Sequence, residues 1–244
     1  MKLFLFLSFF IFFSCSNFSK KRTVKSRTES YLQTEEGGQF ILDIETGLNQ
    51  DKDYVLKRKI TTSKDDITLE RSISIAKFKK LDKNVEGLFP YKSQAEFILN
   101  NEKYVSSMTM SAKTLNVSLR SPDAKWNGER TFKVPRSTIN FCFFYMILDC
   151  AQVTGFLDLA SSKGFGSMPV TIVLETYPFF SDQFLNISEE PFQRGELIYD
   201  GRNKAGEHRL SFNISNQVIF FFLDEKFNLL RTDWIAQQFK QARR

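Results

Sequence analysis

The sequence predicts an α+β fold in which a mostly antiparallel, strongly curved or barrel-like sheet packs around one central apolar helix. Three observations carry this prediction. Apolar and polar residues alternate with a period of two over most of the chain, the gaps between these segments are short, and one apolar stretch, Ser137–Val153, interrupts them. A chain of 244 residues with 42% hydrophobic content can bury one substantial core. We therefore expect a single β-rich domain over residues 39–244.

The first half of this domain reads as a series of strands. They are predicted at Phe40–Ile44, Tyr54–Ile60, Ile67–Ile75, Ala95–Leu99, Tyr104–Met110 and Leu115–Leu119. Asn100–Lys103 has the residues of a hairpin turn. Connections this short cannot contain the crossover helix that a parallel pair requires, so antiparallel pairing is expected.

The stretch Ser137–Val153 is expected to form the central helix. Ser137 can accept a hydrogen bond from the free amides of a first turn, and Gly155 can take the left-handed conformation that ends a helix. Because nearly every side of this helix is apolar, neighbouring elements must cover it all round. The strands that precede and follow it would provide that cover.

The second half resumes strand character after a small-residue loop at Gly155–Gly166. Strands are predicted at Val170–Glu175, Gly195–Tyr199, Arg209–Ile214, Val218–Leu223 and Leu229–Ile235, with hairpin-sized gaps between the later ones. The polar, basic end Gln237–Arg244 is expected to form a last helical turn or to fray.

The N-terminus has the pattern of a signal peptide over residues 1–14. Met1–Lys2 supplies a short positive start, Leu3–Phe13 an apolar run, and Ser14–Ser16 a small-residue stop. A run of this length is too short for the roughly 20 residues that a membrane-spanning helix needs. It therefore predicts export rather than a spanning anchor.

Residues Phe12-Phe13-Ser14-Cys15 resemble the bacterial lipobox, although Phe12 and Phe13 replace its usual leucine and small residue. The resemblance implies lipidation of Cys15 and a membrane anchor, and Ser16 resembles the outer-membrane sorting pattern of Gram-negative lipoproteins. The expected location is the cell envelope. Two alternatives stay open: an ordinary secretory signal with a chance cysteine, and eukaryotic secretion. The latter would use Asn-X-Ser sequons at Asn17, Asn116, Asn186 and Asn213.

Residues 15–38 are expected to form the lipidated cysteine and a polar, basic tether. Lysines and arginines cluster at its start, and Glu35–Gly38 closes it. A flexible chain of this length has an end-to-end distance of roughly 25 Å, which would hold the domain just off the bilayer. The basic cluster would either contact anionic headgroups or remain solvated.

The body of the chain also carries a resemblance. A β-rich first half, a helix after a proline, a strand ending near Tyr177-Pro178, and a hairpin from Phe222–Asp224 to Leu229–Arg231 resemble uncharacterised bacterial periplasmic β-domain proteins. The resemblance spans most of Gln39–Ile235 and implies no catalytic residues.

Cys142 and Cys150 are predicted to be two buried, reduced thiols. Eight residues apart on a helix, their Cα atoms would be about 12 Å from each other, whereas a disulfide needs roughly 4.4 to 6.8 Å. The stretch Phe143–Leu148 between them contains no Gly, Pro, Asn or Asp that would make a turn.

No sequence motif for a cofactor, metal ion or nucleic acid stands out. The single histidine, His208, has no cysteine near it in the sequence and is expected to be exposed at the start of a strand. The net charge of +6 is spread along the chain, without zinc-ligand spacing or a basic helix. Gly164–Met168 does not match the nucleophile elbow of serine hydrolases, because its serine follows both glycines.

Two functions therefore compete. The first is a lipid-anchored cell-envelope protein with a non-catalytic binding or structural role, whose partners would be the membrane and an envelope protein or apolar ligand. The second is an envelope hydrolase whose carboxylates converge only in the fold. A deep cavity with two or more carboxylates within about 10 Å of each other would favour the hydrolase, and an apolar groove beside the helix without such carboxylates would favour the binding protein.

Overall fold

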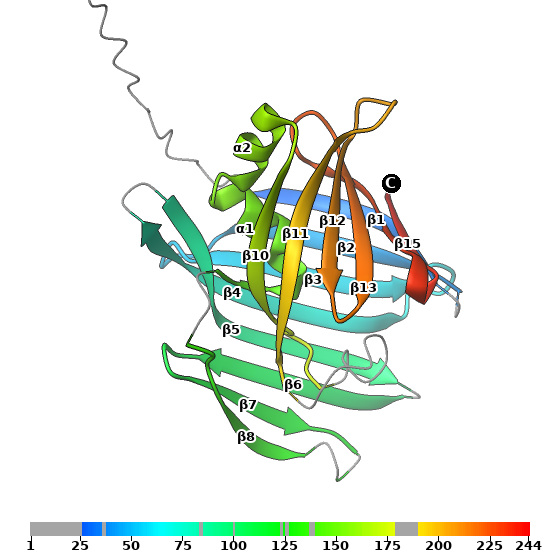
Figure 1. The fold of residues 1–244 in the computed structure, drawn as a ribbon. Helices are drawn as coiled ribbons and strands as arrows, with labels where there is room; N and C mark the ends of the chain where they lie inside the picture. Colours follow the sequence, from blue (N-terminus) through cyan, green and yellow to red (C-terminus); the bar gives the residue numbers. More distant parts are fainter. Residues whose placement is uncertain are drawn as a thin grey trace, which may run out of the picture.

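The computed structural model describes residues 26–35, 38–82, 85–99, 101–122, 124, 127–136, 140–178 and 190–244. In these residues fifteen strands form one sheet with the order β8-β7-β6-β5-β4-β3-β2-β1-β15-β14-β13-β12-β11-β10-β9. The sheet therefore has two arms that diverge from the β1–β15 pair, an N-terminal arm from β1 to β8 and a C-terminal arm from β15 back to β9 (Figure 1).

The strands of the N-terminal arm are β1 (Arg27–Glu35), β2 (Gly38–Leu48), β3 (Tyr54–Thr62), β4 (Thr68–Asp82), β5 (Val85–Leu99), β6 (Glu102–Met110), β7 (Thr114–Arg120) and β8 (Gly128–Lys133). Those of the C-terminal arm are β9 (Phe141–Phe143), β10 (Gly166–Val173), β11 (Phe192–Arg202), β12 (His208–Ile214), β13 (Gln217–Leu223), β14 (Leu229–Trp234) and β15 (Phe239–Arg243). The helical elements are η2 (Phe144–Met146), α1 (Ile147–Val153), α2 (Phe156–Lys163) and η4 (Ile235–Gln237).

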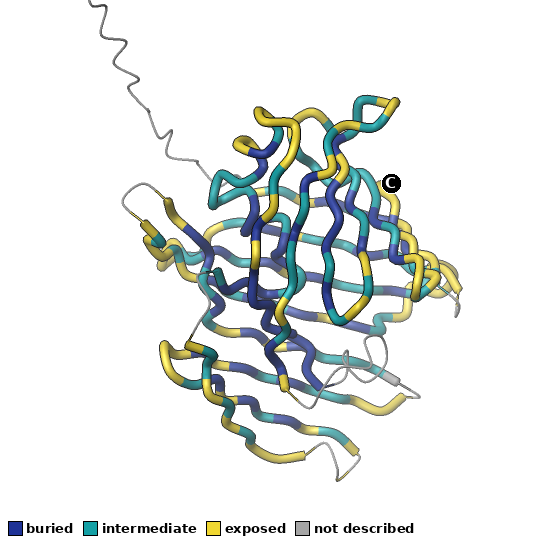
Figure 2. Tube along the Cα trace, viewed as in Figure 1, coloured by how far each residue is buried: buried dark blue, intermediate teal, exposed yellow. Residues whose placement is uncertain are grey.

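The two arms fold over one another. In Figure 1 the strands β2 to β8 run across the molecule, and β10 to β13 stand upright in front of them. β8 and β9 are at opposite ends of the strand order, so the sheet is strongly bent but not closed within the described residues. Figure 2 shows buried residues where the arms face each other and exposed residues along β8 and in the outer loops. The core therefore lies between the two arms.

The predicted central helix is wrong, and the fold is a mostly β structure with two short helices. Phe141–Phe143 forms β9, parallel to β10, before the chain turns through η2 into α1. A short, continuously apolar run suits a strand buried on both faces as well as a helix, and periodicity cannot separate the two. The predicted start at Ser137 lies outside the described residues. The predicted end is confirmed, since α1 ends at Val153 and Gly155 has a left-handed φ of 78°.

The residues that follow α1 also differ from the prediction. Phe156–Lys163, expected to be part of a loop, forms α2, which ends at Gly164 with a left-handed φ of 81°. Together α1 and α2 supply the crossover that the parallel β9–β10 pair needs. Among the described pairs, this one is the exception to antiparallel pairing, so the prediction of a mostly antiparallel sheet is confirmed.

Two segments that were not predicted as strands form the two middle strands of the sheet. Arg27–Glu35, assigned to the tether, is β1, and Phe239–Arg243, assigned to the tail, is β15. The inward-facing residues of β1 are Glu29, Tyr31 and Gln33, so its buried face is mostly polar and gives no hydrophobic alternation. A further strand that was not predicted, β8, lies at an edge of the sheet and is mostly exposed. Neither of its faces needs apolar residues, so its sequence lacks the alternation by which strands are predicted.

Cys142 and Cys150 form a disulfide, so the prediction of two reduced thiols is wrong. Their Cα atoms are 6.4 Å apart. The prediction assumed a continuous helix, whereas Cys142 lies in β9, Cys150 lies in α1, and η2 reverses the chain between them. A one-turn helix of the 3₁₀ type makes this reversal without Gly, Pro, Asn or Asp.

Candidate functional site

A cavity of about 370 Å³ lies between the two arms of the sheet. Its walls come from β1 to β5 on one side and β13 to β15 on the other, and η2 and α1 form a further wall. Alternate residues of several strands point into it, as the period of a strand requires. Its apolar lining is Phe40, Leu42, Ile44, Ile60, Leu69, Phe97, Phe144, Ile147, Leu148, Ile219, Phe221, Leu229, Trp234 and Phe239. Its size is within the range of small-molecule sites, about 300 to 1,000 Å³.

One row of polar residues crosses the floor of the cavity. Thr232 in β14 pairs with Gln241 in β15, which pairs with Gln33 in β1. Phe221 and Phe40 extend the same row on either side. The three polar side chains all line the cavity, and each residue is at most 7% exposed. We call Thr232, Gln241 and Gln33 the polar row.

The polar row has few partners in the protein. Gln33 donates from Nε2 to Glu35 Oε1 over 3.4 Å. Among the described residues, the side chains of Thr232 and Gln241 have no hydrogen-bond partner. Buried polar groups in proteins are nearly always hydrogen-bonded, because leaving one unpaired costs about 1 to 3 kcal/mol. Both residues line the cavity, so their partner is expected to be water or a ligand within it.

Charged residues line another part of the cavity. Arg58 Nη1 lies 2.7 Å from Glu70 Oε1, and the Ser72 hydroxyl donates to the same oxygen over 3.1 Å. The Arg58 guanidinium also stacks 3.4 Å from the centre of the Tyr145 ring. Both members of the ion pair are buried. The positive charge of Arg58 is therefore already matched within the wall.

Glu35 adds a second carboxylate to the cavity lining. Its pKa is raised by burial, a shift that the Gln33 hydrogen bond opposes and the charge of Glu70 increases. The charged groups of the lining are thus two carboxylates and one guanidinium. Within the described residues, the lining therefore has no positive charge without an acidic partner.

Glu175 holds the η2 wall of the cavity in place. Its two carboxylate oxygens accept the backbone N–H groups of Phe144 and Tyr145, each over 3.0 Å. The residue is 1% exposed, and burial raises its pKa to about 8. The two hydrogen bonds and the positive charge of Arg58 lower the pKa and so reduce this shift. Because Phe144 and Tyr145 line the cavity, this carboxyl group fixes the shape of its wall.

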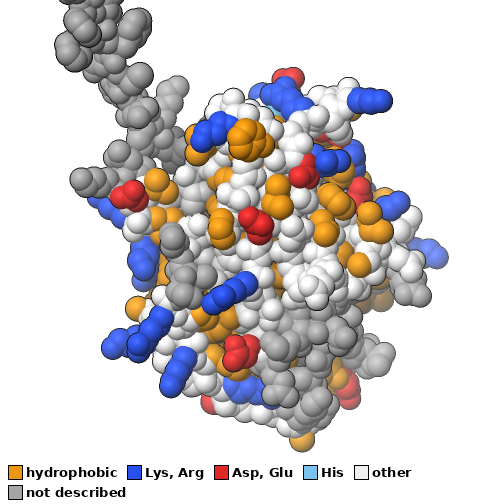
Figure 3. All heavy atoms as spheres, in the orientation of Figure 1, with side chains coloured by type: hydrophobic (Ala, Val, Ile, Leu, Met, Phe, Trp, Pro, Cys, Tyr) orange, Lys and Arg blue, Asp and Glu red, His pale blue; other side chains and the backbone are white. Residues whose placement is uncertain are grey.

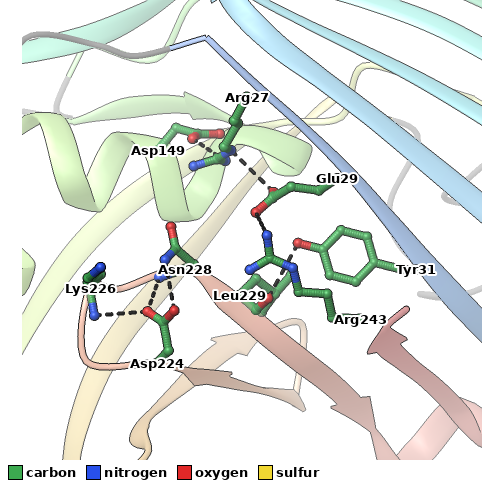
Figure 4. Close-up of polar contacts among 9 residues, drawn as sticks. All are labelled: Arg27, Glu29, Tyr31, Asp149, Asp224, Lys226, Asn228, Leu229 and Arg243. Carbon is green, nitrogen blue, oxygen red and sulfur yellow. Dashed lines mark hydrogen bonds and ion pairs between the residues drawn. The ribbon is translucent and has the colours of Figure 1, made fainter.

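Ion pairs of two buried carboxylates, Asp149 and Glu29, join α1 to the middle of the sheet. Arg27 Nη2 lies 2.7 Å from Asp149 Oδ1, and Arg27 Nε lies 3.2 Å from Glu29 Oε2 (Figure 4). Arg243 in β15 reaches the other oxygen of Glu29 over 3.5 Å. Nearby, the hydroxyl of Tyr31 donates to the carbonyl oxygen of Leu229 over 3.5 Å. The short helix α1 is thereby attached to both β1 and, through Glu29, β15.

A second cavity, of about 440 Å³, lies beside the disulfide. Its lining includes both cysteines and apolar residues of β5, β9 and β10, together with Lys79 and Arg136. Asn140 and Thr154, two polar residues of its lining, already donate hydrogen bonds to the carbonyl oxygens of Pro169 and Cys150. The first cavity is therefore the better candidate for a ligand site.

The outer surface gives no comparable site on the face that Figure 3 shows. Lys and Arg side chains are spread mainly around the rim of this face, and hydrophobic side chains form small separate groups between them. In the described residues, no group of three or more His, Cys, Asp or Glu side chains could hold a metal ion. The same residues contain no helix with the length and hydropathy to span a membrane.

Cys15, the predicted lipidation site, lies outside the described residues.

His208 is buried, so the prediction that it is exposed at the start of a strand is wrong. Its Nδ1 lies 2.6 Å from the Tyr199 hydroxyl, its ring centroid lies 4.5 Å from that of Phe227, and burial lowers its pKa. It does not line the cavity.

The fold and the cavity define a β-sheet protein with an internal, mainly apolar site. No known family model and no curated protein sequence matches the chain. Among solved structures it is similar to a β-barrel-like protein of the domain of unknown function DUF1849 from Brucella abortus. That similarity has a TM-score of 0.47 and 8% sequence identity, and covers 91% of this chain and 97% of the other.

Proposed function

We propose that the chain is a cell-envelope protein, anchored through an acylated Cys15, whose sheet binds the alkyl chain of a small amphiphile in the cavity between its arms. The observation that carries the binding function is this cavity of about 370 Å³ with its mainly apolar lining. Apolar walls favour alkyl groups by about 0.8 kcal/mol for each CH₂ buried. The occupant is therefore expected to be hydrocarbon along most of its length.

The size of the cavity suggests one chain. If a methylene group takes about the 30 Å³ of a water molecule in the liquid, a cavity of about 370 Å³ accommodates a chain on the order of twelve carbons. A lipid with two long chains would exceed this space. A single-chain amphiphile is the ligand class that fits.

Export is supported by two independent features. The leader ends at Ser14-Cys15, and Cys142 and Cys150 form a disulfide. Disulfides persist in oxidising compartments such as the bacterial periplasm and are rare in the cytosol. Both features agree with an envelope protein.

Fluorescence of Trp234, which lines the cavity, provides the test. The full-length chain in phospholipid nanodiscs would be titrated with ω-bromododecanol, whose bromine quenches tryptophan on contact. The other tryptophan, Trp126, lies outside the described residues, so the signal of a Trp234→Phe variant is subtracted. Saturable quenching is expected, and a linear, non-saturating signal would contradict the proposal.

A pair of matched variants locates the binding. Ile219 lines the cavity and is 2% exposed, whereas Ile235 is 73% exposed and outside it. Ile219→Phe reduces the free volume and is expected to weaken quenching, while Ile235→Phe leaves it unchanged. Equal quenching in both variants would place the bromoalkyl chain elsewhere.

The hydrolase remains a second candidate because Glu35 and Glu70 line the same cavity. Glu70 is held by Arg58 and Ser72, which leaves it poorly placed to give or take a proton. Binding is therefore the better-supported function. Hydrolysis of a dodecyl ester by the wild type, lost in Glu35→Gln, would favour the hydrolase instead.

A further inference from the structure

The apolar walls explain how the cavity could hold an alkyl chain, but not why three polar side chains cross its floor. The residues flanking the polar row in the register are Phe221 and Phe40, so the row is a polar strip inside an apolar surface. Such a strip lowers the affinity for plain hydrocarbon unless the ligand pairs with it.

We propose that the head group of the ligand lies on the polar row, donates hydrogen bonds to it, and carries no negative charge. This inference rests on the proposed function, because it names the head group of the amphiphile whose chain occupies the cavity. A hydroxyl or an ammonium group has this chemistry.

The hydrogen bonds already made leave acceptors open for a donating head group. Gln33 uses one of its two amide N–H groups toward Glu35, and its carbonyl oxygen remains free to accept. The Thr232 hydroxyl and the Gln241 amide can each accept as well as donate. A head group with at least one N–H or O–H therefore finds acceptors on all three residues.

The charges around the cavity exclude an anionic head group. Glu35 and Glu70 line the cavity, and the one cation of the lining, Arg58, is bound to Glu70 and covered by the Tyr145 ring. A carboxylate in this space would lose its water without gaining a free positive partner. An ammonium group would instead be attracted by the second carboxylate.

The first test compares head groups on one chain length. The wild type in nanodiscs would be titrated with ω-bromododecanol, ω-bromododecylamine and ω-bromododecanoate, again reading the quenching of Trp234. We expect the alcohol and the amine to bind at least about tenfold more tightly than the carboxylate. If the carboxylate binds as tightly as the alcohol or the amine, the head-group inference fails while the proposed function stands. If none of the three quenches saturably, the proposed function itself fails.

The second test removes one hydroxyl from the polar row. Thr232→Val keeps the volume of the side chain and is expected to weaken binding of ω-bromododecanol by about three- to tenfold. Binding of bromododecane, which has no head group, should not weaken, because valine makes the strip less polar. A Thr232→Val protein that binds the alcohol as tightly as the wild type would overturn the inference.

Thr171 provides the matched control. It is 1% exposed, its hydroxyl has no partner among the described residues, and it does not line the cavity. Thr171→Val and Thr232→Val should both leave the melting temperature unchanged or slightly raised, because each removes an unpaired buried hydroxyl. Only Thr232→Val should affect the alcohol. Weaker alcohol binding in both variants would mean a general change in the fold and would count against the head-group inference.

Discussion

The guanidinium of Arg27, the first residue of β1, lies 2.7 Å from the carboxylate of Asp149 in α1, 122 residues further along the chain. Burial raises the pKa of Asp149, and Arg27 and a hydrogen bond from Tyr54 oppose that shift. The ion pair therefore gives a buried acidic side chain a cationic partner at the point where a helix that lines the cavity meets the middle of the sheet.

Arg27→Met is expected to lower the free energy of unfolding by about 2 to 3 kcal/mol, because Asp149 would remain buried without its cation. Fully buried pairs lose about 3 to 5 kcal/mol in such a change, and the Arg27 side chain is 31% exposed, which reduces the effect. Urea denaturation measures it.

The double variant Arg27→Met with Asp149→Asn is the control, since it removes the stranded charge. It should recover a large part of the lost stability. If Arg27→Met alone is as stable as the wild type, the pair does not stabilise the attachment of α1.

The polar side chains of β1 explain why a strand was mistaken for a tether. Its inward face carries Glu29, Tyr31 and Gln33, and each is buried because of partners that are distant in sequence. Glu29 pairs with Arg243, and Gln33 faces Gln241 in the register. Hydrophobic periodicity detects strands whose inner face is apolar, so β2, β3 and β4 were predicted whereas β1 was not.

Stability is expected to fall as pH rises between about 4.5 and 8 because of Glu175. The folded-state pKa of this group is about 8, against a usual value of 4.5. The folded protein thus holds a proton that the unfolded chain releases. The stability that this proton confers is present below pH 4.5 and is lost as pH rises through about 8. The slope is at most about 1.4 kcal/mol per pH unit.

Glu175→Gln should remove this slope, as urea unfolding at several pH values between about 5 and 8 would show. Glu45→Gln is the matched control, because Glu45 is an exposed carboxylate of a surface ion pair with Lys57. Its slope should equal that of the wild type. Identical slopes in all three proteins would contradict the assigned role of Glu175.

The cavity itself could not be read from the sequence, although many of its walls could. Phe40, Ile60 and Phe221 lie on predicted strands, and their alternation indicates a buried face. The polar row combines Thr232 with Gln33 of β1 and Gln241 of β15, two strands that were not predicted. The pairing of β1 with β15 brings Gln33 to Gln241, and the pairing of β14 with β15 adds Thr232. Residues as far apart in the sequence as Gln33 and Gln241 produce no local sequence pattern that would predict their contact.

The wrong prediction for Cys142 and Cys150 has a different cause. The spacing argument was sound for a helix, but Phe141–Phe143 is a strand. Two signals in the sequence pointed the other way: the aromatic residues around Cys142 favour strands, and an even pair of cysteines in an exported chain favours a disulfide.

Loss of this disulfide is expected to lower the free energy of unfolding by about 2.5 kcal/mol. The bridge closes a loop with a sequence separation of 8, and the chain-entropy relation gives about this value for so short a loop. Urea unfolding of the double variant Cys142→Ala with Cys150→Ala measures it. Dithiothreitol should destabilise the wild type and have no effect on the variant. Two free thiols in the unreduced, denatured protein would contradict the bridge.

Acylation of Cys15 is expected to decide whether the protein stays with the membrane. Each buried CH₂ of an acyl chain adds about 0.8 kcal/mol, and two or more chains together give a stable anchor. Cells that express the wild type and are fed labelled fatty acid should yield labelled protein in the membrane fraction.

Cys15→Ala should abolish the label, whereas Ser16→Ala, a substitution at the next residue, should retain it. Both variants introduce alanine directly after the predicted cleavage point, which lies before Cys15. A loss of label in Cys15→Ala alone would therefore be due to the missing thiol and not to a general disturbance of the leader. Label in Cys15→Ala would assign the lipid to another residue. Absence of label from the wild type would favour the ordinary secretory signal, leaving the sheet and its cavity without a covalent anchor.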